Sequence, residues 1–151
     1  MTTTYQKPQI QIKRIYQYDI HTLWTALTDK TALSEWLMPT TDFELKEGHS
    51  FQFITKPQGS FDGIVNCKIH SFSAPNTITY SWSGGGMKTP TIVTWKLKKL
   101  TPTETSLTLS HSGFTGFSGW VTKQILNMGW KKILSKKLTS YLNMPQNKLA
   151  L

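Results

Sequence analysis

The chain has 151 residues, of which 38% are hydrophobic and 12% aromatic, and its formal net charge is +9. This length suits one domain with one core, and the composition excludes a disordered or collagen-like chain. The basic balance raises the question of a nucleic acid or an anionic membrane as partner. However, Arg14 is the only arginine and the lysines are spread along the chain. We therefore expect a solvated lysine surface and no nucleic-acid partner.

Cysteine content and hydrophobic runs indicate where the protein works. Cys67 is the only cysteine, which excludes an intrachain disulfide and fits a reducing compartment. The first ten residues lack the apolar segment of a signal peptide. No run approaches the roughly 18 apolar residues that a membrane span needs. We expect a cytoplasmic protein without membrane insertion.

A strand and two short helices are predicted near the start of the chain. Apolar and polar residues alternate over residues 9–18, as in a half-buried strand. Asp19 and Asp29 are typical helix N-caps, and the apolar residues that follow them favour helices over 21–27 and 31–36.

From residue 42 the hydrophobic period changes to two, which predicts six short strands with hairpin turns between them. Their alternating residues are Phe43 and Leu45, Phe51 and Phe53, Phe61 to Ile69, Ile78 to Trp82, Val93 to Leu97, and Leu107 to His111. Strands at this spacing indicate an antiparallel meander. Gly84, Gly85 and Gly86 predict a flexible loop between two of these strands.

One long helix is predicted within residues 111–142, about 24 residues and roughly 36 Å long. Its apolar residues recur at steps of three and four and share one face: Leu126, Trp130, Ile133, Leu134, Leu138 and Tyr141. Lys137 falls inside this apolar arc. Ser112 and the glycines at 113, 116 and 119 predict a loop before the helix, a turn or a lid. Together the elements predict an α+β domain whose antiparallel sheet curls around the helix.

Several segments, in this order, resemble one family. The segments are LWTALTDKTALSEWLMP (23–39), FDGIVNCKIHSFSAPNTITYSWSGG (61–85), TWKL (94–97), LTLSHSGF (107–114) and MGWKKIL (128–134). They resemble the helix-grip fold of the START-like (SRPBCC) superfamily, in the family of homologues of the activator of the heat-shock-protein-90 ATPase. The resemblance covers about residues 23–142. It implies a single START-like domain over 1–151, with a core at about 9–143 and tails at 1–8 and 144–151.

The superfamily implies an apolar cavity between the sheet and the long helix, occupied by lipids, sterols, polyketides or other apolar or aromatic molecules. Strand parity and the helical face supply candidate residues for such a cavity. The candidates are Phe53, Phe61, Val65, Tyr80, Trp82, Val93, Trp95, His111 and Leu109 on the sheet, Leu126 and Trp130 on the helix, and Trp36, Met38, Phe114 and Trp120 at the mouth. The alternative for each aromatic residue is simple core filling.

His111 is the most informative polar residue, because strand parity places it inward with Leu107 and Leu109. It is either a hydrogen-bonded core histidine or a group that orients a ligand. Gly129, in the middle of the helix, costs about 1 kcal/mol against alanine. It suggests close approach of a strand or of a ligand, and of the two we favour packing against a strand. Asp42, Glu44 and Glu47 alternate with apolar residues and are expected to face water.

The sequence contains no metal-binding, nucleotide-binding or hydrolase motif, so we expect no metal and no cofactor. The leading hypothesis is a protein that binds an apolar or aromatic small molecule. One alternative is an enzyme, a cyclase or hydrolase acting on such a substrate with His111 as acid–base. Another alternative is a chaperone- or stress-related protein-interaction module that uses the lysine surface.

Overall fold

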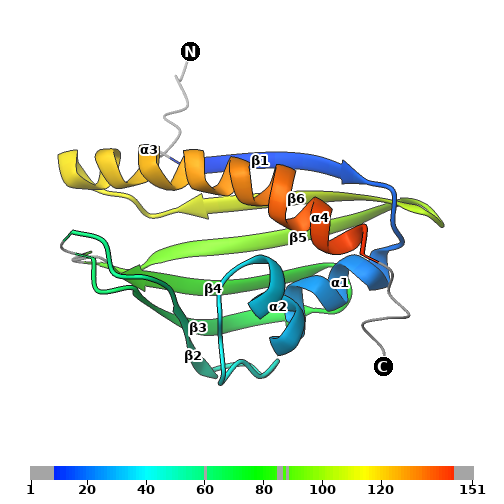
Figure 1. Ribbon diagram of the computed structural model, residues 1–151, viewed down its shortest axis with the longest axis horizontal. Coiled ribbons are helices and arrows are strands. Elements are labelled where there is room, and N and C mark those ends of the chain that lie inside the picture. Colours follow the sequence, from blue (N-terminus) through cyan, green and yellow to red (C-terminus); the bar gives the residue numbers. More distant parts are fainter. Residues whose placement is uncertain (1–8, 60, 85–86, 88, 145–151) are drawn as a thin grey trace, which may run out of the picture.

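The computed structural model describes residues 9–59, 61–84, 87 and 89–144, in which a curled antiparallel sheet holds helices on its concave side (Figure 1). The strands are β1 (Gln9–Tyr16), β2 (Ser50–Ile54), β3 (Ile64–Ser73), β4 (Thr77–Gly84), β5 (Thr91–Thr101) and β6 (Glu104–Ser112). The expected tail at 1–8, nearly all of that at 144–151, and two residues of the expected glycine loop, Gly85 and Gly86, lie outside the described residues.

The sheet has the strand order β1-β6-β5-β4-β3-β2, and all neighbours are antiparallel. The strands from β2 to β6 form a meander, and the first strand then pairs with the last one. Leu109 of β6 lies opposite Ile12 of β1 on one side and Trp95 of β5 on the other. This register keeps most apolar residues of the six strands on the concave face, as their alternation predicts, whereas Ile15, Ile54 and Leu100 are exposed.

Helices α1 (Ile20–Thr28) and α2 (Lys30–Trp36) follow β1 and begin at the two predicted caps. The Asp19 carboxylate accepts hydrogen bonds from the backbone N–H groups of His21 and Thr22, and the Asp29 carboxylate accepts one from Ala32. These bonds hold the pKa of Asp19 below its usual value, the hydroxyl of Thr22 contributing most. Both helices therefore start where unsatisfied backbone donors find a side-chain acceptor.

The strand predicted around Phe43 and Leu45 does not form, and that prediction is wrong. The segment instead runs along the outer edge of β2, where the Asp42 carboxylate accepts a hydrogen bond from the Gln52 N–H at 3.3 Å. Further along this edge the Ile54 N–H donates to the carbonyl oxygen of Pro39 at 2.9 Å. Phe43 is buried against Phe51, with ring centroids 4.8 Å apart. The apolar alternation at residues 43 and 45 therefore does not mark a strand. It reflects the burial of Phe43 beside the edge strand β2.

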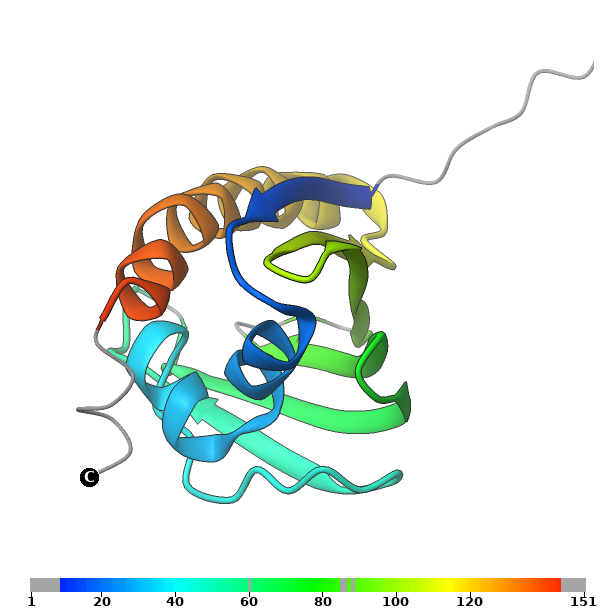
Figure 2. The same cartoon turned by 90° about the vertical axis from the view of Figure 1, so that its right-hand side faces the viewer.

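The long helix is continuous from Gly116 to Leu142 and consists of α3 (Gly116–Lys132), a π-turn η1 (Ile133–Lys137) and α4 (Leu138–Leu142). Figure 2 shows how it covers the open side of the curled sheet, with α1 and α2 below it. The loop expected to include Gly116 and Gly119 ends earlier than predicted, because the helix already begins at Gly116. Figures 1 and 2 together show the expected α+β helix-grip fold.

The π-turn explains why Lys137 is exposed although a regular helix would place it inside the apolar arc. A π-turn takes an extra residue per turn, so the residues that follow it lag in rotation. The Leu138 N–H bonds to the carbonyl oxygen of Ile133, five residues earlier. The lag moves Lys137 out to solvent and buries Leu134 and Leu138 completely. The buried hydroxyl of Tyr16 on β1 donates to the carbonyl oxygen of Leu134 at 2.8 Å.

The core lies between the concave face of the sheet and the helices, which are α1, α2 and the long helix. All six residues of the predicted helical face belong to it, either buried or packed against it. The largest fully buried side chains include Trp36, Trp95, Tyr80, Phe51 and Phe53. Aromatic rings thus fill much of the core, while the space between the helix at residues 122–133 and strands β3 and β4 is not completely filled.

Candidate functional site

A pocket of about 440 Å³ lies between the long helix and strands β3 and β4. Its walls come from the helix, from the two strands and from the loops beside them. The lining residues are Met38, Thr55, Gln58, Phe61, Val65, Trp82, Gly84, Met87, Thr122, Ile125, Leu126, Gly129, Trp130 and Ile133. Most of these are apolar, and only Thr55, Gln58 and Thr122 carry polar side chains. This composition suits an apolar guest with few polar groups.

Trp130 is the centre of the aromatic wall that closes the inner end of this pocket. Its ring centroid lies 5.2 Å from that of Trp82 and 5.5 Å from that of Trp95, in tilted and edge-to-face arrangements. Trp95 in turn packs edge-on against Trp36 at 6.0 Å. Edge-to-face pairs are favourable beyond their buried area, so these contacts stabilise the wall.

His111 is completely buried behind Trp130, and both of its ring nitrogens have partners. The Trp130 indole N–H donates to Nδ1 at 3.1 Å, and Nε2 lies 2.6 Å from the hydroxyl oxygen of Thr91. Because an indole nitrogen only donates, the neutral imidazole carries its hydrogen on Nε2 and donates it to Thr91. The Thr91 hydroxyl then donates to the carbonyl oxygen of Trp82 at 2.9 Å. The chain of bonds runs from the helix through β6 and β5 to β4.

This arrangement favours a neutral imidazole at His111. Burial lowers its pKa to about 3, because the charged imidazolium would lose its hydration. An acid–base role would require breaking the bond to Trp130 or the bond to Thr91. Burial likewise raises the pKa of the Cys67 thiol and of the Tyr80 phenol, so both stay neutral in the core.

Gly129 faces the pocket and does not pack against a strand, which corrects the expectation of close packing. A Cβ atom built at this position would meet no heavy atom within 4 Å. The absence of a side chain therefore leaves open volume beside Trp130 and Leu126. A larger side chain here would occupy the pocket directly.

A second pocket of about 540 Å³ adjoins the first, and Met87 and Thr122 line both. Its other lining residues are Thr89, Thr91, Gly113, Phe114, Thr115, Gly116, Ser118 and Gly119. Several hydroxyl groups make this pocket more polar than the first. Thr91 joins it to the hydrogen-bond chain of His111.

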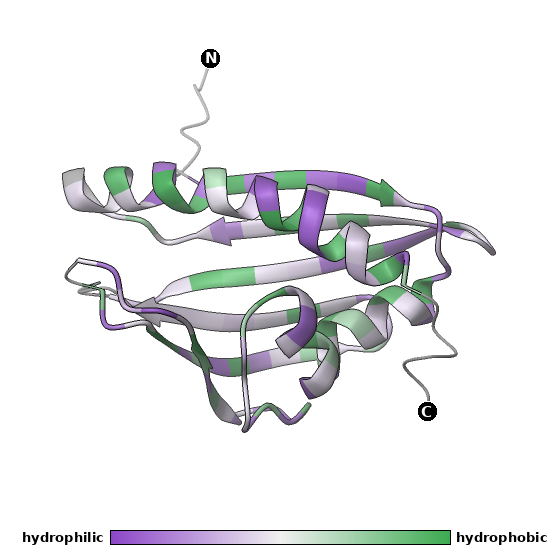
Figure 3. Ribbon diagram, viewed as in Figure 1, coloured by the Kyte–Doolittle hydropathy of each residue, from purple (hydrophilic) through white to green (hydrophobic). Residues whose placement is uncertain are grey.

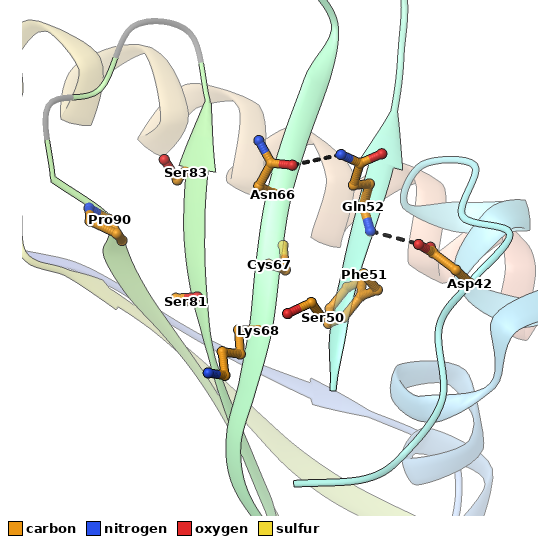
Figure 4. Close-up of a pocket in the computed structure, with 10 residues that line it drawn as sticks. All are labelled: Asp42, Ser50, Phe51, Gln52, Asn66, Cys67, Lys68, Ser81, Ser83 and Pro90. Atoms are coloured by element: carbon orange, nitrogen blue, oxygen red, sulfur yellow. Dashed lines mark hydrogen bonds between the residues drawn. The ribbon is translucent and has the colours of Figure 1, made fainter. Parts of the chain in front are cut away.

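A third pocket, of about 420 Å³, lies on the opposite, solvent-facing side of the sheet (Figure 4). Outward side chains of neighbouring strands line it, such as Gln52 on β2 and Asn66 on β3, which are joined by a hydrogen bond of 2.7 Å. Asp42 accepts the Gln52 N–H at its rim. Of the described residues that line this pocket, Phe51 is the one that is aromatic.

The structure brings together only part of the predicted site. Six of the predicted residues line the apolar pocket: Met38, Phe61, Val65, Trp82, Leu126 and Trp130. Six others lie buried in the core around it: Trp36, Phe53, Tyr80, Val93, Trp95 and Leu109. His111 lies behind Trp130, and Phe114 lines the second pocket. Trp120, expected at the mouth, is 53% exposed and lines none of these pockets.

The remaining pocket residues were not predicted. Thr55, Gln58 and Met87 lie on turns or loops, where alternation gives no direction for a side chain. Thr122 and Ile125 flank the predicted helical face, and a wider apolar stripe would have included them. Ile133 was predicted on that face, but not as a pocket residue. Gly129 was noticed as unusual, but its sequence context did not distinguish a packed strand from open space.

Two classes of feature are absent from the described part of the chain. No three His, Cys, Asp or Glu side chains of the described residues are grouped so that they could hold a metal ion. Among the helices described here, none is long and apolar enough to cross a membrane.

Comparisons with known proteins agree with this architecture. A family model described as "Activator of Hsp90 ATPase homolog 1-like protein" matches residues 17–143. The crystal structure of MLL2253 from Mesorhizobium loti is 26% identical, with a TM-score of 0.78, over 90% of this chain and 97% of that one. CalU16 from Micromonospora echinospora is 23% identical, with a TM-score of 0.71, and the match covers 93% of this chain and 79% of that one.

A third similar structure is PFC0360w from Plasmodium falciparum, described as an HSP90 activator. It is 20% identical, with a TM-score of 0.65, over 82% of this chain and 88% of that one. At these identities the likeness to CalU16 and to the Plasmodium protein shows the shared fold. No curated protein matches the sequence.

Proposed function

The chain belongs to the family of Activator of Hsp90 ATPase homolog 1-like proteins, and from this premise we propose that it binds one apolar or aromatic small molecule in the pocket beneath α3. The observation that carries the proposal is the open, mostly apolar volume of about 440 Å³ beside Gly129 and Trp130. This volume falls within the range of about 300–1,000 Å³ that is typical of ligand sites. A lipid-, sterol- or polyketide-like molecule has the required chemistry.

The polar groups around the pocket support a binding role over catalysis. Thr55, Gln58 and Thr122 are placed to orient a guest through hydrogen bonds. His111, the residue of the enzyme alternative, has both nitrogens engaged and a pKa lowered to about 3. It is therefore a poor proton carrier near neutral pH. The cyclase or hydrolase alternative has no other candidate acid–base among the pocket residues.

A titration followed by amide and indole NMR tests the proposal. The ligand is unidentified, so the probes are oleate, cholesterol and anilinonaphthalene sulfonate, each added to the full chain. At least one probe is expected to bind saturably and to shift the indole signals of Trp82 and Trp130. The indole of Trp36 donates to the carbonyl oxygen of Ala26 at 2.8 Å, outside the pocket, and serves as the internal control.

Variants at Gly129 locate the binding. Gly129→Leu fills the pocket and is expected to weaken the probe at least about tenfold, while Gly129→Ala adds one methyl group and keeps most of the affinity. If no probe binds saturably, or if Gly129→Leu leaves every affinity unchanged, the proposal is wrong. A stable protein complex recovered in the absence of any ligand would then favour the chaperone-partner alternative.

A further inference from the structure

The outward face of α3 exposes an unusual group of apolar side chains. Trp120, Val121, Ile125 and Met128 are 53%, 37%, 65% and 73% exposed, respectively. They account for half of the large hydrophobic side chains that are exposed among the described residues. Exposed apolar side chains gathered on one helix in this way mark interaction surfaces. We call these four residues the apolar half of the α3 face.

The part of the helix that follows Met128, from the end of α3 into η1, is basic. Lys131, Lys132 and Lys136 are exposed. At about 100° per residue, Lys131 and Lys132 lie within about 60° of Met128 around the helix. No aspartate or glutamate follows Glu104 in the sequence. Figure 3 shows the strongest hydrophilic bands of the helix in this second half. We call these three lysines the basic half.

We propose that the α3 face docks on the surface of an anionic lipid bilayer, with the apolar half in the headgroup–acyl boundary and the basic half against acidic headgroups. Interfacial helices combine apolar side chains, often with tryptophan, and lysines in this way. Tryptophan is favoured at the membrane interface because its ring is amphipathic. The docking is superficial and needs no membrane-spanning helix.

Charge and chemistry distinguish this occupant from two others. A second copy docking through the same face by two-fold symmetry would bring two acid-free helices together, so no acidic side chain of either helix would neutralise the lysines. A nucleic acid would neutralise the lysines but has no partner for Ile125 and Met128, and the helix contains no arginine. A bilayer with acidic lipids matches both halves.

The docking face borders the apolar pocket. Ile125 belongs to both, since it is exposed on the helix and also lines the pocket. Gly129 and Thr122 line the same edge of the helix. A docked protein would therefore hold the pocket rim next to the acyl region. The docking inference does not depend on this, because it rests on the exposed face alone.

Vesicle flotation with the full chain tests the inference. We expect binding to vesicles of phosphatidylcholine with phosphatidylserine, at least about tenfold weaker binding to phosphatidylcholine alone, and weakening as salt is raised. Lys131→Glu with Lys132→Glu is expected to reduce binding more than about twentyfold. Ile125→Gln with Met128→Gln, which leaves the net charge unchanged, is also expected to reduce it strongly.

The matched control is Lys96→Glu with Lys98→Glu, which makes the same charge change on exposed positions of β5. This variant should retain most of the binding, and thermal unfolding should confirm that all variants fold. Equal losses in both charge variants, no effect of the apolar pair, or no binding at all would overturn the proposal. A dimer in sedimentation that Met128→Glu dissociates would assign the face to a second copy. A DNA duplex that competes for the same face would also overturn it.

Discussion

The hydroxyl of Tyr16 and the carbonyl oxygen of Leu134 lie 2.8 Å apart in the core, and this bond ties the first strand to the π-turn of the long helix. The two residues are 118 positions apart in the chain. The contact fixes where the helix departs from regular geometry, and it holds the helix against the strand that closes the meander.

Tyr16→Phe should lower the free energy of unfolding by about 1–2 kcal/mol, because the buried carbonyl of Leu134 loses a donor. Urea unfolding measures the change. Tyr18→Phe is the matched control, since the Tyr18 hydroxyl donates to Asn143 on the surface and its loss should cost less than about 0.5 kcal/mol. Equal effects of the two changes would contradict the assignment of Tyr16 as a core tether.

Acid should destabilise the protein through His111. The unfolded chain takes up a proton near the ordinary pKa of about 6.5, whereas the folded protein stays neutral down to about 3. As the pH falls from about 6 to 4, the unfolded state therefore gains protons that the folded state excludes. The free energy of unfolding should fall by about 1.4 kcal/mol per pH unit from this group.

His111→Gln isolates this contribution, because glutamine does not titrate, while the carboxylates common to both proteins still do. The stability difference between the two proteins should shrink as the pH falls. Urea unfolding at several pH values measures it. Parallel curves for the two proteins would mean that the imidazole is not held neutral.

Gly129→Ala should raise the free energy of unfolding by about 0.5–1 kcal/mol. Alanine is the better helix former, and its methyl group would meet no atom within 4 Å. The same urea experiment tests it. A loss of stability would show that the space beside Gly129 is smaller than the structure indicates.

Gly63→Ala should be far more costly than Gly48→Ala. Both glycines have positive φ angles, of 84° and 82°, so both changes introduce left-handed strain of about 1–2 kcal/mol. A Cβ atom at Gly63 would also lie 2.2 Å from the carbonyl oxygen of Thr55, whereas at Gly48 it meets nothing within 4 Å. Gly63→Ala should therefore cost at least about 2 kcal/mol more, and comparable losses would contradict this close approach.

Periodicity alone predicted most of the fold, because each buried strand face and the helical face are long enough to repeat. It failed at residues 42–45. The alternation there is too short to distinguish a strand from an irregular segment that runs along the edge of the sheet. It also placed Lys137 inside the apolar arc, because no local sequence pattern indicates a π-turn. The bond from Tyr16 that accompanies this turn is a long-range contact that no local window contains.

The candidate site was less predictable than the fold for a physical reason. Strand parity shows which side chains point inward, but not whether they meet a neighbour or an unfilled volume. Trp95 and Trp82 have the same parity, yet only Trp82 lines the apolar pocket. An unfilled volume depends on how several elements pack together. At Gly129 it also depends on the fact that glycine has no side chain.

The segment that was mistaken for a strand has a consequence for the behaviour of the protein in concentrated solution. It occupies the backbone donors of Gln52 and Ile54 along the outer edge of β2, through the Asp42 carboxylate and the Pro39 carbonyl. An incoming chain would have to displace both acceptors before it could extend the sheet. The segment thus protects the β2 edge of the sheet from pairing with strands of other molecules, which would otherwise lead to polymerisation.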